Sequence, residues 1–143
     1  LNLIMAYVKI INGSDEGSHV EIATNSLSVA NGDMLALASG FIAKAVAATP
    51  RIIGIANGTK TYASDNHTVA KSKVNYLRVI PGETILELET SADVTQANVG
   101  KFYTLTAAQK VDAATGAAAK GVLPLQLIEY IGSTTKARFV AVQ

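Results

Sequence analysis

The sequence predicts a mostly β protein: a compact β-sandwich or barrel-like domain of short antiparallel strands, with one short helix and an extended N-terminal arm. Three observations carry this prediction. Apolar residues mostly alternate with polar ones instead of recurring at helical spacing. Turn signals rich in Asn, Gly, Ser and Pro separate the apolar runs. Hydrophobic residues make up 49% of the chain and charged residues only 16%, a composition that excludes a disordered chain.

The chain has 143 residues, a length that favours one domain and is sufficient for a buried core. Residues 1–18 are expected to form an N-terminal arm, with a strand and a loop. Residues 19–143 are expected to form a single β-rich domain. Two quasi-similar β units, at about 29–80 and 93–143, are an open subdivision of that domain.

The subdivision depends on a weak internal similarity. Each half contains a glycine turn, a strand, a short hairpin, a small-residue loop and a core strand. The segments that align, with small gaps, are Gly32 with Gly100, Leu37 with Leu105, Ile42 with Val111, and residues 53–55 with 123–125. The first two pairs share one offset of 68 residues. A recurrent β-hairpin pattern and a true duplication both explain such a similarity.

Alternating apolar runs predict the strands of the first half. They cover residues 6–11, 19–24, 34–38, 41–45 and 51–56, with a polar loop at 12–18. Ser39-Gly40 separates two of these runs and predicts a tight hairpin.

Residues 50–59, PRIIGIANGT, allow two interpretations. A Gly-rich loop after a strand can bind phosphate, because its backbone N–H groups converge on the anion. Here, however, Gly54 lies inside the apolar run, and no Gly-Lys-Ser/Thr ending follows it. A buried strand with a glycine at a bulge or a close backbone approach, ended by a turn at Asn57-Gly58, is therefore preferred.

The second half continues with strands at 71–80 and 84–90, separated by the Pro81-Gly82 stop signal. Residues 91–100 predict the short helix, with Ser91 as its cap and Gly100 near its end. Residues 107–121 are rich in alanine but lack an apolar stripe, so they are expected to form a β-turn and loop. Further strands are predicted at 101–106, 122–131 and 136–143.

Glu87 and Glu89 are the best candidates for acid–base chemistry. They share one face of a predicted strand, about 6.5–7 Å apart. A second polar cluster, Ser64-Asp65-Asn66-His67, holds a histidine beside a hydroxyl and a carboxylate. Trp is absent and aromatic residues are few, so an exposed or interface face explains the glutamates better, and a turn explains the second cluster better.

No cofactor, metal, nucleic-acid or membrane role is expected. The chain has no cysteine, and its two histidines, His19 and His67, are too few for a multi-histidine metal site. A cation cage around Asp15 and Glu16 would need six or more oxygen ligands. The net charge of +1 does not suit a nucleic-acid protein. The longest apolar stretch, residues 34–48, is too short to span a membrane.

Residues 32–56, GDMLALASGFIAKAVAATPRIIGIA, resemble bacteriophage head-decoration (capsid cement) proteins. In that family a Gly-Asp turn precedes a strand that ends in Leu, and a short hairpin is followed by a strand of the pattern aiGia. The matching residues are Gly32-Asp33, 35–37, 41–45 and 52–56. More loosely, residues 93–131 resemble phage capsid accessory proteins, in which a helical turn precedes a Gly-Lys-x-Tyr-x-Leu strand, here from Gly100.

The resemblance implies a non-enzymatic homotrimer bound to the major capsid protein at three-fold or quasi-three-fold positions. It places the protein on the virion surface, and in the host cytoplasm during assembly. It also implies an N-terminal arm that adds to the capsid protein, here about residues 5–18. The candidate shell or subunit contacts are Tyr7, Val8, Ile10, Ile11, Glu87 and Glu89.

Two alternatives stay open. The first is another virion structural module, such as a tail, fibre or adhesin domain. The second is a small β-barrel enzyme or ligand-binding domain that uses Glu87, Glu89 and His67.

Overall fold

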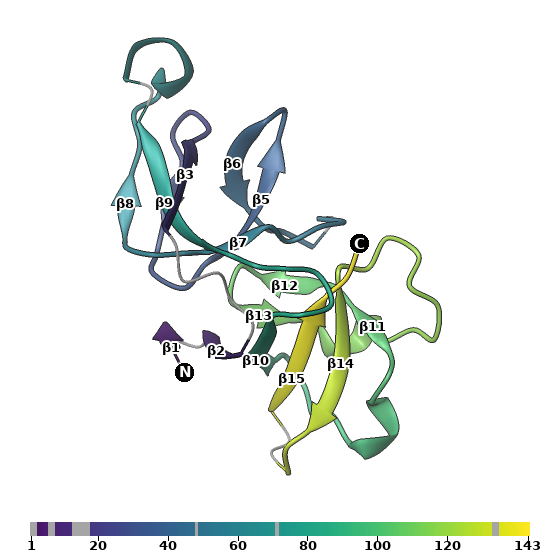
Figure 1. The fold of residues 1–143 in the computed structure, drawn as a ribbon. Helices are drawn as coiled ribbons and strands as arrows, with labels where there is room; N and C mark the ends of the chain where they lie inside the picture. The colour runs from purple at the N-terminus through teal and green to yellow at the C-terminus, as the bar shows by residue number, and fades with distance from the viewer. Residues whose placement is uncertain (1–2, 6–7, 13–17, 48, 71, 133–134) are drawn as a thin grey trace.

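The computed structural model describes residues 3–5, 8–12, 18–47, 49–70, 72–132 and 135–143. Strands hold 45% of the residues and helical turns 8%, so the predicted mostly β class is confirmed. The strands form a near-closed barrel-like sheet and a curled half-barrel sheet. Figure 1 shows the half-barrel above and the barrel below, with the C-terminus beside their junction.

The half-barrel lies within residues 18–80, which we call unit 1. Its five-stranded sheet has the order β3 (Ser18–Ile22), β9 (Lys73–Arg78), β7 (Gly54–Ala56), β5 (Met34–Ala38) and β6 (Phe41–Lys44). A separate two-stranded ribbon pairs β4 (Ser28–Val29) with β8 (Lys60–Thr61). All neighbouring strands in the five-stranded sheet are antiparallel.

The barrel-like sheet lies within residues 85–143, which we call unit 2, and is joined by the first two strands of the chain. Its main path is β1 (Leu3–Met5), β2 (Val8–Asn12), β10 (Ile85–Thr90), β15 (Lys136–Ala141), β14 (Leu125–Tyr130) and β11 (Phe102–Tyr103). The hairpin of β12 (Leu105–Ala107) and β13 (Lys110–Val111) returns to β10, where β13 pairs in parallel. This pairing nearly closes the sheet.

Both units use one strand arrangement. Counting β11 and β12 as one interrupted strand, the five strands of each unit lie in the order first, fifth, fourth, second, third. In each unit the third strand also meets the end of the first in parallel, through Ala23 and Ile42 in unit 1 and through Thr90 and Val111 in unit 2. The structural units therefore begin one strand earlier, at β3 and β10, than the quasi-similar units expected at about 29–80 and 93–143.

Backbone hydrogen bonds follow the same equivalence. The Gly32 N–H donates to the carbonyl of Ala56, and the Gly100 N–H donates to the carbonyl of Leu127. In the same way, the Thr24 N–H donates to the carbonyl of Ile42, and the Ser91 N–H donates to the carbonyl of Val111. The aligned pairs Gly32/Gly100 and Ile42/Val111 thus occupy corresponding places in the two units. The sequence alignment of residues 53–55 with 123–125 is wrong by one residue, because strand pairing makes Gly54 correspond to Leu125.

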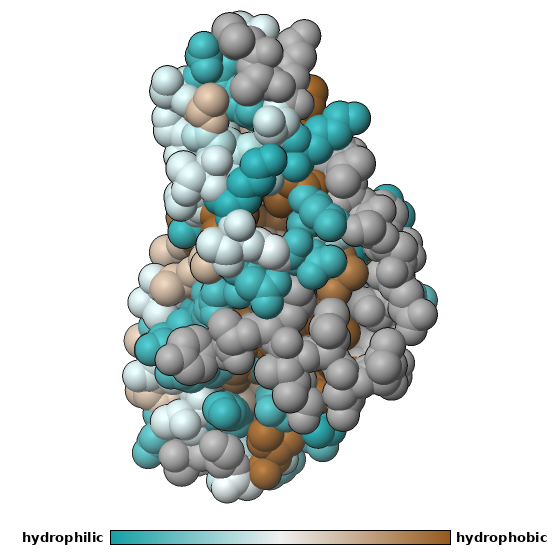
Figure 2. All heavy atoms as spheres, turned by 90° about the vertical axis from the view of Figure 1, so that its left-hand side faces the viewer, coloured by the Kyte–Doolittle hydropathy of each residue, from teal (hydrophilic) through white to brown (hydrophobic). Residues whose placement is uncertain are grey.

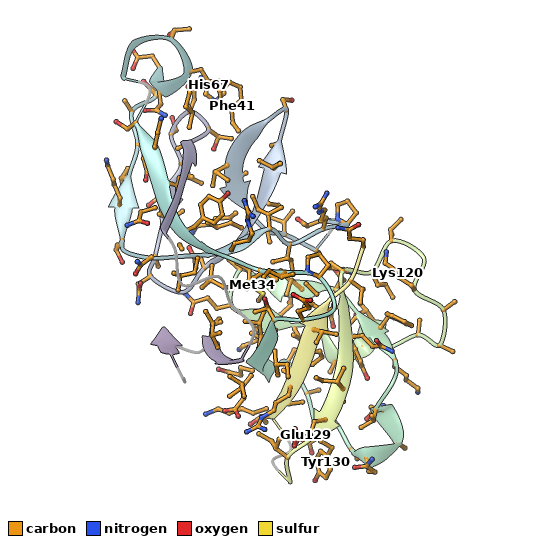
Figure 3. The ribbon with its side chains drawn as sticks, in the orientation of Figure 1. Met34, Phe41, His67, Lys120, Glu129 and Tyr130 are labelled. Carbon is orange, nitrogen blue, oxygen red and sulfur yellow. The ribbon has the colours of Figure 1, made fainter. Side chains whose placement is uncertain are left out.

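Two apolar cores result from this arrangement. One face of the unit 1 sheet packs on unit 2, and the larger core there combines Met34, Ile52 and Ile55 with the unit 2 interior. Figure 3 shows Met34 at this junction. The other face of the unit 1 sheet encloses a smaller core with Leu35, Ile42, Ala56, Val74 and Tyr76 among its members.

The predicted Ser39-Gly40 hairpin is present between β5 and β6. Leu37 pairs with Ile42 and Ala38 with Phe41, so the loop contains only two residues. Ser39 has a φ of 50° and Gly40 a φ of 84°. Two consecutive positive φ values are the signature of the type I′ turn that fits a twisted hairpin.

The helix predicted over residues 91–100 is present as a single turn, η2 (Gln96–Asn98). Val94 is fully buried in the larger core, and residues 93–95 before this turn are not helical. The Thr95 N–H donates to the Asn98 side chain at 2.8 Å, a local bond that competes with helix extension. Two more single turns are η1 (Asn66–Ala70) and η3 (Ala113–Thr115).

Candidate interaction surface

Glu87 and Glu89 share one face of β10, as the alternation predicts. Arg138 on β15 lies opposite Glu87, and its Nε is 3.6 Å from a carboxylate oxygen of Glu87. The Nζ of Lys110 lies 3.3 Å from a carboxylate oxygen of Glu89. Both carboxylates are half-buried and each is paired with a cation of unit 2, so the geometry gives them a structural role.

His67 lies against unit 1 and is held by two elements. Its ring stacks on Phe41, with ring centroids 3.7 Å apart and an angle of 12° between the rings; Figure 3 shows the pair near the end of unit 1. The His67 Nε2 accepts a hydrogen bond from the Asn25 N–H, and the His67 N–H donates to the Asn25 side chain. These contacts fix the histidine, while Ser64 and Asp65 beside it are exposed.

Asn66 is the buried member of that cluster. Its side-chain Nδ2 donates to the carbonyls of Ala23 and Ser72, and its Oδ1 accepts from the Ser72 N–H at 2.8 Å. The side chain therefore ties the η1 turn to the end of β3. The polar cluster is a turn, which is the preferred interpretation from sequence.

Asp33 is a buried carboxylate that sequence reasoning used only as part of the Gly-Asp turn. It accepts from the Ala30 N–H at 2.8 Å and from the Gln109 side chain at 2.9 Å. Lys44 Nζ lies 3.5 Å from Oδ2, the same oxygen that accepts from Ala30. Because Gln109 belongs to unit 2, this carboxylate helps to join the units.

The candidate contact residues of the N-terminal strand divide in the structure. Val8 and Ile10 on β2 are buried in the larger core, and β2 pairs with β10. Ile11 is half-buried. Tyr7 lies outside the described residues, as do Asp15 and Glu16. Val8 and Ile10 therefore serve the core of this chain.

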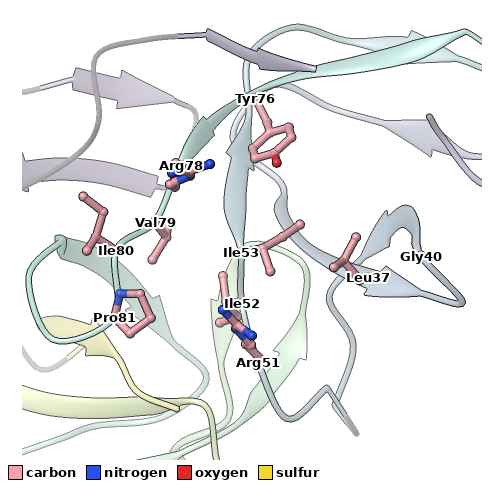
Figure 4. Close-up of a pocket in the computed structure, with 10 residues that line it drawn as sticks. All are labelled: Leu37, Gly40, Arg51, Ile52, Ile53, Tyr76, Arg78, Val79, Ile80 and Pro81. Atoms are coloured by element: carbon pink, nitrogen blue, oxygen red, sulfur yellow. The ribbon is translucent and has the colours of Figure 1, made fainter. Parts of the chain in front are cut away.

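A groove on unit 1 that sequence reasoning missed lies on the described surface (Figure 4). It has a volume of about 560 Å³. We call it the arginine groove and define it by its lining residues Leu37, Gly40, Arg51, Ile52, Ile53, Tyr76, Arg78, Val79, Ile80 and Pro81. Leu37 is 55% exposed, so a large apolar side chain faces the open groove.

Arg51 and Arg78 give the groove its charge. Both residues are exposed, and within the described ranges neither has an ion-pair partner. The groove is otherwise mostly apolar, and it combines residues from three separate stretches of the chain. The only sequence signal for the groove is one arginine, Arg51 or Arg78, in each of two predicted strands. A single arginine in a strand is ordinary for a solvent-exposed face.

The face seen in Figure 2 differs from the groove. Its coloured atoms are mostly hydrophilic or weakly polar, with hydrophobic atoms in small separate areas. Large exposed apolar patches are typical of interaction sites. The described atoms of this face form no such broad patch.

Two buried tyrosines titrate abnormally, and both lie away from the groove. Burial raises the pKa of Tyr62 and of Tyr103 above the ordinary value of 10.0. Tyr62 donates its hydroxyl to the Lys73 carbonyl at 3.2 Å. Tyr103 packs edge-to-face on Phe139, with ring centroids 5.9 Å apart. Both remain protonated near neutral pH and act as core residues.

No group of three His, Cys, Asp or Glu side chains in the described part of the chain could hold a metal ion. None of the helices described is long and apolar enough to cross a membrane. The chain matches no protein-family model, no curated protein and no solved structure.

Proposed function

We propose that this protein is a structural capsid decoration (cement) protein that binds the outer surface of an icosahedral phage head and stabilises it. Its partner is the major capsid protein, and it acts as a homotrimer at three-fold or quasi-three-fold positions. It takes no cofactor and makes no direct contact with nucleic acid or membrane. Its place is the virion surface, after assembly in the host cytoplasm.

The observation that carries the proposal is the arginine groove. It leaves Leu37 exposed in a hollow that is mostly apolar apart from Arg51 and Arg78, and another protein surface would cover this leucine. The residues considered for catalysis instead make structural contacts: Glu87 and Glu89 are in ion pairs, and His67 is stacked on Phe41. The resemblance of residues 32–56 to decoration proteins, which includes the groove residues Leu37 and Arg51, adds the capsid as partner.

A trimer also suits such a surface. A three-fold contact joins different patches of neighbouring copies and closes on itself. Three grooves on one trimer then act together on a symmetric shell, so weak individual contacts give tight binding.

The first test is binding to expanded phage heads that lack this protein. We expect it to co-sediment with such heads and to raise the temperature at which they break. Multi-angle light scattering should give three times the chain mass of 14.9 kDa. Failure to associate with heads at any salt concentration would overturn the proposal. Location on a tail or fibre in whole virions would favour the other structural module instead.

A further inference from the structure

The arginine groove lies where unit 2 has core side chains. In unit 1 Gly54 pairs with Arg78 across β7 and β9. In unit 2 the corresponding pair across β14 and β15 is Leu125 with Ala141. Both unit 2 side chains are fully buried. Where unit 2 has Leu125, unit 1 has a glycine without a side chain. Where unit 2 has Ala141, unit 1 has the exposed cation Arg78.

The correspondence of these four residues is fixed by register. The next pairs along the two ladders are Ile55 with Leu77 and Gln126 with Val140. Beyond the ladders, the Val79 N–H donates to the Ile53 carbonyl and the Val142 N–H donates to the Pro124 carbonyl. In each unit this hydrogen bond lies one residue beyond the pair, Gly54 with Arg78 or Leu125 with Ala141. The two ladders therefore correspond without a register shift.

A second position shows the consequence. Leu37 and Leu105 align in sequence, and each pairs with the corresponding residue of the next strand, Ile42 or Val111. Leu105 is completely buried, whereas Leu37 is 55% exposed. Unit 2 therefore closes over this leucine, and unit 1 leaves it uncovered.

Within unit 1, other side chains fill only part of the volume that Leu125 occupies in unit 2. The Tyr76 ring lies against Gly54, so closely that a Cβ on Gly54 would overlap it. Beyond that ring the space stays open as the groove of about 560 Å³. A hollow of this size takes one large apolar side chain with its neighbouring backbone.

The positive charge of the groove favours a ligand that carries a carboxylate. Arg51 and Arg78 both line it, and among the described residues no carboxylate does. A guanidinium binds a carboxylate through two parallel hydrogen bonds. Two arginines are too few for the many phosphate contacts of a nucleic acid, and the apolar lining does not suit a sugar-phosphate backbone.

We infer that the arginine groove receives an exposed segment of a partner protein in which a large apolar residue stands next to an acidic one. The apolar side chain takes the place that Leu125 fills in unit 2 and covers Leu37. The carboxylate pairs with Arg78 or Arg51. This inference rests on the proposed function for the groove as a contact surface, and it adds the chemistry of the partner.

The test is an NMR titration of isotope-labelled protein with blocked hexapeptides. The probe is acetyl-Gly-Ser-Leu-Glu-Ser-Gly-amide, compared with the same peptide carrying Lys for Glu or Gly for Leu. We expect shifts confined to the groove, at Leu37, Gly40 and Arg78, with binding at least threefold weaker for either altered peptide. The Arg51→Glu/Arg78→Glu variant should reverse the preference toward the lysine peptide. Lys73→Glu, an exposed change on the same strand, should keep it.

Each outcome separates the inference from the proposed function. Equal binding of all three peptides, or shifts outside the groove, would overturn the inference. If Arg51→Glu/Arg78→Glu abolishes binding to heads while the peptides show no preference, the capsid function stands and the partner chemistry is wrong. If the peptides behave as expected while the protein ignores heads, the groove assignment stands and the capsid function is wrong. A well-dispersed spectrum of each variant shows that it has folded.

Discussion

Tyr76 and Gly54 are in direct contact across the unit 1 sheet, where the aromatic ring occupies the space that a Cβ of residue 54 would need. A Cβ there would also lie 2.8 Å from the carbonyl oxygen of Leu77. The glycine is therefore required by a close approach of side chain and backbone. Its place within an apolar run follows from this contact, and anion binding is not needed to explain it.

Gly54→Ala should destabilise the protein by about 1–3 kcal/mol, because the added methyl forces the ring and strand apart. Urea denaturation measures the change. In a Tyr76→Ala background the same substitution should cost less, since the ring is gone. Equal costs in both backgrounds would contradict the contact.

Asn66→Ala should cost about 2–4 kcal/mol, because one buried and two partly buried hydrogen bonds to the backbone are lost. The measurement is again urea denaturation. Asp65→Ala, at the exposed neighbouring position, is the control and should stay within about 0.5 kcal/mol of the parent. An Asn66→Ala loss as small as that of the control would rule out the proposed tie between η1 and β3.

Ser39→Asn should stabilise the protein by about 0.5 kcal/mol, because Asn tolerates the positive φ that the type I′ turn imposes at this position. The melting temperature should rise by about 1–2 °C. Gly40→Ala is the opposite control and should lower it, since alanine is strained at a φ of 84°. A lower melting temperature for Ser39→Asn would show that the turn is of another type.

Alkaline pH should weaken the fold through Tyr103. Burial raises the pKa of this phenol in the folded chain above its value of 10.0 in the unfolded chain, so the folded chain holds the proton more tightly. The protonated Tyr103 phenol contributes fully to the free energy of unfolding below about pH 10. This contribution is lost as the pH rises through the raised pKa of the folded chain. Urea denaturation at several pH values from 8 to 11 should show a flatter decline for Tyr103→Phe. A decline as steep as that of the parent would mean that Tyr103 is not the responsible group.

Local patterns explain what could be predicted without coordinates. Alternation along residues 84–90 placed Glu87 and Glu89 on one face, and Ser39-Gly40 marked a hairpin, because both properties depend on neighbours in the chain. The sequence pattern also predicts that Ile42 and Val111 are equivalent, since equivalent barrel positions select similar side chains. The helix predicted over residues 91–100 is longer than the single turn in the structure, because propensity does not account for the burial of Val94.

Contacts between distant segments decided the rest. Arg138 and Lys110 reach the two glutamates, and Phe41 reaches His67, only through strand pairing and sheet curvature. The arginine groove likewise needs residues 37, 51–53 and 76–81 to converge. The sequence by itself determined the β class, the turns and the alternation, because these depend on backbone preferences and period. Tertiary structure alone determined which carboxylates are paired, which leucine is covered and where a hollow stays open, because these depend on packing between segments far apart in the chain.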